Sequence, residues 1–122
     1  MKAKDYETAV GHFQMAISIV EDSNILRKLG EAFEKLGDVT QAELYYTRAI
    51  RRNLRHPSAY VELIGMLIDR ERFGEAASFL KAADLRRSQH PVLEQYRSIL
   101  SQSQQSKQVP LVEKSGGNTA EL

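Results

Sequence analysis

Residues 26–49 read LRKLGEAFEKLGDVTQAELYYTRA, and this stretch decides the fold. On both sides of the Gly37-Asp38 pair, apolar residues recur every three or four positions, as they do in amphipathic helices. Glycine suits the left-handed turn at the end of one helix, and aspartate caps the start of the next. The stretch therefore predicts two helices joined by a very short turn.

A pattern of small and large residues recurs three times along the chain. Each copy consists of an alanine, a large apolar residue four positions later and a second alanine three positions after that. The first alanines of the copies are 33 and 34 residues apart; the copies are Ala9-Phe13-Ala16, Ala42-Tyr46-Ala49 and Ala76-Leu80-Ala83. A period of about 34 residues is typical of solenoids built from two-helix repeats, in which small residues let helices approach closely.

The helix that precedes Gly37 carries a second motif. Leu29, Gly30 and Phe33 match the L-G-x2-Y part of the tetratricopeptide repeat (TPR) pattern, with Leu26 in the place of its tryptophan. Over roughly residues 5–102 the chain thus resembles the TPR family. The resemblance implies an all-α fold: a right-handed superhelix of antiparallel helix pairs (a TPR-like α-solenoid) that ends in a C-terminal capping helix.

The repeat period divides the chain into segments, and we call the first helix of each repeat A and the second B. Residues 1–22 are expected to form a half-repeat with a B helix only, followed by repeats at 23–56 and 57–90. Residues 91–104 are expected to form the capping helix, and the polar segment 105–122 a disordered tail. In the second repeat Ile64 takes the place of the motif glycine and Gly65 follows it, so we expect a small register shift or looser packing there.

Composition sets limits on function. The 122 residues include 17 basic and 16 acidic ones, so the net charge of +1 gives no general attraction to nucleic acid. There are no cysteines, and no segment is long and apolar enough for a membrane span or a secretory signal. The default prediction is a cytoplasmic protein that neither binds nucleic acid nor inserts into membranes.

The candidates for catalysis are weak. His12, His56 and His90 have no carboxylate at a convincing helical spacing, and we interpret them as loop or surface residues. The glycine pair at 116–117 lies outside any strand or helix context that would hold a phosphate. We therefore expect no catalytic residues, no metal site and no cofactor.

The resemblance implies a binding surface on the A helices, which line the concave side of such solenoids. Its function would be to bind a peptide or a partner protein within a larger assembly. This surface would be basic toward the N-terminus and apolar to acidic toward the C-terminus. The implied residues are Asn24, Arg27, Lys28, Glu31 and Lys35 in the first A helix, and Ser58, Val61, Glu62, Gly65, Ile68 and Asp69 in the second.

One sub-family function is not expected. TPR domains that bind chaperone tails hold a terminal carboxylate with an asparagine, a lysine and an arginine. This chain has Lys28, Ser58 and Glu62 at those positions, and Glu62 would repel a carboxylate. We therefore predict that the protein does not bind chaperone tails through a dicarboxylate clamp.

The first B helix has no A helix before it in this chain. Tyr6, Val10, Phe13 and Ile17 share a broad apolar face, of which we expect one flank to be open. Three explanations are considered: the chain is the C-terminal piece of a longer repeat protein, a partner supplies the missing helix, or the first helix frays. The open flank also suggests a homo-oligomer, and a regulatory or targeting end of a larger enzyme is a further alternative.

A basic ridge is the remaining candidate. Arg48, Arg52 and Arg55 follow one line on a predicted helix and are joined by Arg51. We interpret the ridge as a solvated surface near a helix C-terminus, with a docking site for an acidic partner as the alternative.

Overall fold

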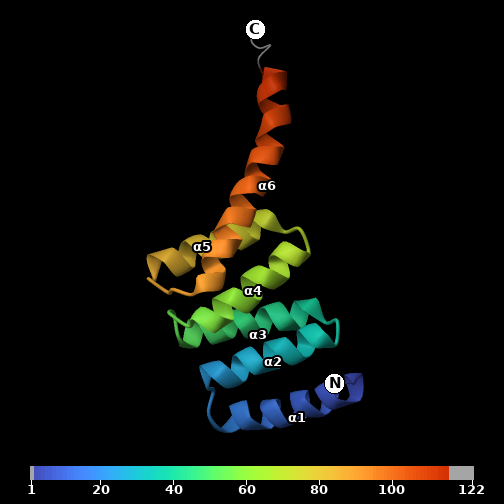
Figure 1. The fold of residues 1–122 in the computed structure, drawn as a ribbon. Coiled ribbons are helices and arrows are strands. Elements are labelled where there is room, and N and C mark those ends of the chain that lie inside the picture. Colours follow the sequence, from blue (N-terminus) through green and yellow to red (C-terminus); the bar gives the residue numbers. More distant parts are fainter. Residues whose placement is uncertain (1, 116–122) are drawn as a thin grey trace.

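The computed structural model describes the backbone of residues 2–115 and the side chains up to residue 103, and every regular element in this range is an α-helix. Figure 1 shows the helices stacked in chain order, with α1 at one end and α6 at the other. Their bounds are α1 Ala3–Ile19, α2 Ser23–Lys35, α3 Val39–Arg52, α4 Pro57–Asp69, α5 Phe73–Leu85 and α6 Pro91–Ser115.

The helices form the antiparallel pairs that the period predicts. The A helices α2, α4 and α6 contact one another in succession, while α3 packs against α2 and α4, and α5 packs against α4 and α6. The all-α, TPR-like solenoid is thereby confirmed.

The last helix is longer than predicted. We expected the capping helix to end at 104, but α6 continues to Ser115, so residues 105–115 are helical rather than disordered. The rest of the predicted tail, 116–122, lies outside the described residues.

The turns within the two repeats have the same geometry. After α2, the amide of Asp38 donates to the carbonyl of Phe33 at 2.9 Å, and Gly37 has a φ of 83°. After α4, the amide of Arg72 donates to the carbonyl of Leu67 at 2.9 Å, and Glu71 has a φ of 59°. Both are Schellman turns, which leave the backbone in the left-handed region. Gly74 takes no part in the second turn, because it lies in the first turn of α5.

The small residues of the recurring pattern lie where the helices touch. Ala42, Ala49, Ala76 and Ala83 are all fully buried. Gly30 serves the same purpose in α2, because a Cβ at this position would lie 2.7 Å from Cδ1 of Tyr46. Close approach of the helices therefore depends on residues with little or no side chain.

Packing around Ile64 is tight, so the expectation of looser packing in the second repeat is wrong. Ile64 is fully buried in the core. Gly65, one residue later, faces a different helix: a Cβ there would lie 2.5 Å from the hydroxyl oxygen of Tyr96 in α6. The glycine next to Ile64 therefore makes room for the next A helix rather than for the B helix of its own repeat.

The apolar face of α1 packs against α2 on one side. Val10, Phe13 and Ile17 are half-buried and pack against the core, and Tyr6 is also half-buried. No residue of α1 is fully buried, and the expectation that one flank of this face is open stays a prediction. Large apolar side chains are also exposed at Met15, Ile19 and Val20, which are 69%, 84% and 63% exposed.

The two A helices of the repeats begin at different cap residues. Asp22 caps α2, accepting hydrogen bonds from two backbone amides. His56 caps α4, its Nδ1 accepting from the amide of Ala59 at 3.4 Å. His56 thus lies in a loop, but it is only 7% exposed, so its interpretation as a surface residue is wrong.

Candidate functional site

The three A helices enclose a hollow of about 230 Å³, which we call the acidic hollow. It contains four carboxylates and a single lysine, together with apolar and aromatic side chains. The lining residues are Glu31, Glu34 and Lys35 of α2, Val61, Glu62, Gly65, Met66 and Asp69 of α4, and Tyr96 of α6.

Most of this lining was predicted from the sequence. Glu31, Lys35, Val61, Glu62, Gly65 and Asp69 all come from the set implied by the TPR resemblance, and the structure brings them together. Glu34, Met66 and Tyr96 were missed. A helical-wheel argument could have included Glu34, which is one turn from Glu31, but nothing in the sequence pattern indicated Met66 or Tyr96 as lining residues.

The charges in the acidic hollow are only partly balanced by neighbours. Glu62 forms an ion pair with Arg27, with 2.6 Å between its Oε2 and Nη1 of the arginine. Burial raises the pKa of Glu62, and the arginine opposes that rise. Glu34 accepts a hydrogen bond from the hydroxyl of Tyr46 at 2.7 Å. Glu31 and Asp69 are both exposed to solvent.

Tyr96 forms one wall of the acidic hollow. Burial raises the pKa of its hydroxyl, and the carboxylates of Asp69, Glu34 and Glu62 raise it further. The side chain of Tyr96 is therefore a neutral phenol in a negatively charged hollow. Its hydroxyl end contacts Gly65. Tyr96 can donate a hydrogen bond to a ligand without losing its proton at ordinary pH.

A second hollow, of about 310 Å³, lies between α1 and α2, and we call it the apolar groove. Tyr6, Ala9, Phe13 and Ala32 form its apolar lining. Its charged lining consists of Lys28, Glu31 and Lys35. Tyr6 and Phe13, predicted to lie on an open flank, therefore contribute to a groove that opens beside the concave surface.

The remaining predicted residues have other roles. Asn24 accepts a hydrogen bond at Oδ1 from Nε2 of His56, 2.9 Å away, and so joins the starts of α2 and α4. Burial lowers the pKa of His56, and the charge of Arg27 lowers it further, which keeps the ring neutral. Ser58 and Ile68 line neither hollow, and Ile68 packs against the core.

The predicted basic ridge is partly neutralised. Arg48 forms an ion pair with Glu21 and lies over the ring of Tyr45, with 5.2 Å between its Cζ and the ring centroid. Arg52 donates from Nε to the carbonyl of Glu21 at 3.2 Å. These contacts tie α3 to the turn before α2, which supports the interpretation of the ridge as structural surface.

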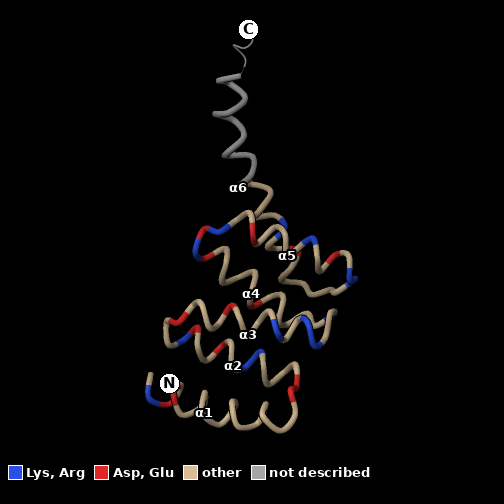
Figure 2. Tube along the Cα trace, turned by 180° about the vertical axis from the view of Figure 1, so that it is seen from behind, with Lys and Arg blue, Asp and Glu red and all other residues tan. Residues whose placement is uncertain are grey.

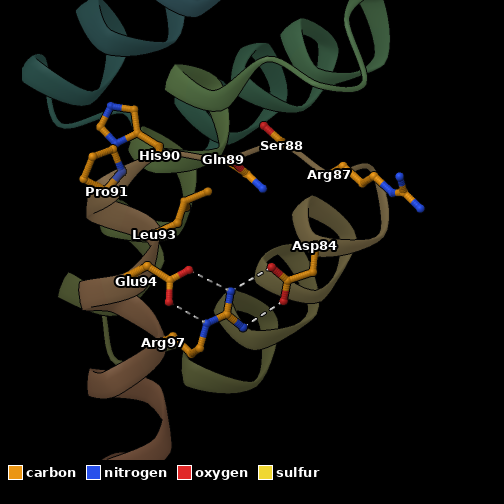
Figure 3. Close-up of a pocket in the computed structure, with 9 residues that line it drawn as sticks. All are labelled: Asp84, Arg87, Ser88, Gln89, His90, Pro91, Leu93, Glu94 and Arg97. Atoms are coloured by element: carbon orange, nitrogen blue, oxygen red, sulfur yellow. Dashed lines mark hydrogen bonds and ion pairs between the residues drawn. The ribbon is translucent and has the colours of Figure 1, made fainter.

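A hollow of about 470 Å³ between α5 and the start of α6 is lined in part by ion pairs (Figure 3). Nη1 and Nη2 of Arg97 lie 2.8 and 2.7 Å from the two carboxylate oxygens of Asp84, and its Nε lies 3.4 Å from Glu94. The guanidinium thereby joins α6 to α5, which stabilises the position of the capping helix.

Two further findings concern the described residues. No group of three or more histidine and carboxylate side chains among them is placed to hold a metal ion. Within the same part of the chain, none of the helices has the length and apolar character needed to cross a membrane.

A stack of antiparallel helix pairs, in which each pair contacts its neighbours, is the architecture of a helical-repeat protein. Comparison with protein families agrees: the family model described as tetratricopeptide repeat matches residues 27–90, more than half of the 122-residue chain. The chain belongs to the tetratricopeptide repeat family, whose repeats generally mediate protein–protein interaction. A search of curated proteins found no match.

Proposed function

We propose that the protein acts without catalysis of its own, as a scaffold that binds a peptide segment of a partner protein along its concave surface. The observation that carries the proposal is the convergence of residues from α2, α4 and α6 in the acidic hollow. These residues are spread over more than sixty sequence positions, yet the fold places them around one accessible, charged hollow, as a shared binding surface requires. A cytoplasmic location stays a prediction.

The charge of the hollow supports a partner other than a carboxylate tail. Glu62 lies in the acidic hollow near Glu31 and Glu34, and its one ion-pair partner among the described residues is Arg27. An incoming terminal carboxylate would meet like charges there, at a cost of several kcal/mol for close approach. A dicarboxylate clamp is accordingly excluded from the proposal.

The proposal can be tested with a random twelve-residue peptide library displayed on phage and selected on the immobilised full chain. An enriched peptide is then synthesised and titrated into the isotope-labelled protein. We expect amide shifts to change along α2 and α4, around Glu31, Lys35 and Glu62. Shift changes confined to the outer faces of α3 and α5, or the absence of any enriched peptide, would contradict the proposal.

A second candidate function is self-association through the outer face of α1. Met15, Ile19 and Val20 are exposed on this helix, and Figure 2 shows that α1 carries charge only near its N-terminal end. Sedimentation of the wild type and of Met15→Glu with Ile19→Lys tests it. A wild type that sediments as a larger species than the double variant supports self-association, and a monomeric wild type at high concentration rules it out.

A further inference from the structure

The acidic hollow and the apolar groove are two halves of one surface. Glu31 and Lys35 of α2 line both hollows. They are one helical turn apart, and the two hollows open on either side of this row. A ligand that crosses the row would therefore contact both hollows at once.

The two halves differ sharply in chemistry. In the acidic hollow, Glu31, Glu34 and Asp69 remain in excess over Lys35 after Glu62 is paired with Arg27. In the apolar groove, the rings of Tyr6 and Phe13 and the small side chains of Ala9 and Ala32 leave room for an apolar group. Lysine side chains at 28 and 35 border that groove and disfavour a second cation there.

We infer that the occupant of this surface is a peptide with a large apolar side chain, which enters the apolar groove, and a lysine or arginine, which enters the acidic hollow. This inference rests on the proposed function and adds the chemistry of the partner. Charge complementarity favours the basic residue, because the cation is attracted by each carboxylate of the acidic hollow that has no ion-pair partner. Burial of a leucine- or phenylalanine-sized group in the groove adds the apolar part of the affinity.

The width of α2 fixes the spacing between the two side chains. A helix with its side chains is about 10 Å across. An extended peptide rises about 3.3 Å per residue, so its two anchoring side chains should be about three residues apart. Lys28 lines the apolar groove and not the acidic hollow, so an acidic residue of the peptide is tolerated at the apolar end and disfavoured at the other end.

The sequences of the phage-selected peptides give the first test. We expect enrichment of peptides that pair an aromatic or large aliphatic residue with a lysine or arginine about three positions away. Enriched peptides that bind the concave surface but are acidic, or lack an apolar anchor, would overturn this inference and leave the proposed function intact. Failure to enrich any peptide would overturn both.

Variants of the protein give the second test, by fluorescence anisotropy with one synthetic selected peptide. Glu31→Lys with Asp69→Lys should weaken binding about tenfold or more, because both carboxylates are exposed and line the acidic hollow. Glu7→Lys with Glu71→Lys makes the same change in net charge outside both hollows and serves as the matched control. Equal weakening by the two pairs would show only a general charge effect and would overturn the inference.

The apolar half is tested with Ala9→Leu, which fills part of the groove, and with a peptide whose apolar anchor is replaced by alanine. Replacing the anchor should weaken binding to the wild type about tenfold, and should weaken binding to Ala9→Leu much less. The peptide change needs no alteration of the protein, so the test stands even if Ala9→Leu disturbs α1. Equal affinity of both peptides for the wild type would contradict the placement of an apolar anchor.

Discussion

The repeats α2–α3 and α4–α5 have the same backbone arrangement, but the side chains where their two helices meet differ in size. In the first repeat Gly30 of α2 faces the ring of Tyr46 in α3. The positions 34 residues later hold Ile64 and Leu80, both buried in the core. A very small residue opposite a very large one is thus replaced by two of intermediate size. We infer that helix packing in each repeat depends on the combined size of the two facing side chains, rather than on a glycine at the motif position.

The turns and caps differ in the same way. The left-handed position after the A helix is Gly37 in the first repeat and Glu71 in the second. The cap of the A helix is Asp22 in the first repeat and the buried His56 in the second. In each case the backbone geometry is kept, while the second repeat uses a residue that is less suited to the turn or has an imidazole in place of a carboxylate at the cap.

The largest expected effect comes from exchanging the glycine of the first repeat for the residue of the second. Gly30→Ile places a Cβ 2.7 Å from the ring of Tyr46 and should lower the free energy of unfolding by about 3 kcal/mol. Adding Tyr46→Leu, which recreates the pair of the second repeat, should recover a large part of that loss. Urea unfolding of the four members of this double-mutant cycle measures the coupling.

The cycle distinguishes paired packing from a general need for glycine. If losses in Gly30→Ile and Tyr46→Leu simply add in the double variant, the two repeats do not use equivalent pairs. Ile64→Leu is a suitable control, because it keeps the volume of a buried side chain and should cost less than about 1.5 kcal/mol.

A smaller effect is expected from exchanging the turn residues. Glu71 has a φ of 59°, where residues with a Cβ are disfavoured, so Glu71→Gly should raise the free energy of unfolding by about 1 kcal/mol. Gly37→Glu, at a φ of 83°, should lower it by about as much or more. Thermal melts followed by circular dichroism would show the two shifts. Changes of the same sign in both variants would mean that the turns are not equivalent.

The smallest expected effect is the pH dependence that His56 adds to the second repeat. Its pKa is lowered from 6.5 by burial and by Arg27, so the unfolded chain binds a proton that the folded chain does not. Stability should therefore fall as the pH falls below about 6.5, and this loss continues down to the folded-state pKa. In His56→Asp, which keeps a capping side chain, this part of the loss should vanish.

Urea unfolding of the wild type and of His56→Asp at pH 7.5 and 5.5 gives the required comparison. The difference between the two proteins isolates position 56 from the other groups that titrate over this range. A wild type that loses no more stability than the variant would show that His56 is not held neutral by the fold.

Much of the concave surface was predictable because it depends on helical periodicity. Glu31, Lys35, Glu62 and Asp69 follow from the A-helix positions that the TPR pattern implies, and the structure brings them together. Tyr96 was not predictable as a site residue, since its contact with Gly65 joins two helices whose relative position the pattern does not specify. The surroundings of α1 show a related limit: periodicity shows that a face is apolar but not how much of it a neighbour covers.

The amino-acid sequence by itself determined the repeat, the turns at Gly37-Asp38 and the small residues at the helix contacts. These are local properties, set by a period of 34 residues, by backbone conformation and by side-chain size. Only the tertiary structure decided that Arg27 is committed to Glu62, that His56 is buried against Asn24, and that two hollows of opposite chemistry meet at α2. Such features depend on how neighbouring repeats are rotated against each other, because that rotation sets which side chains from distant positions come within a few ångströms.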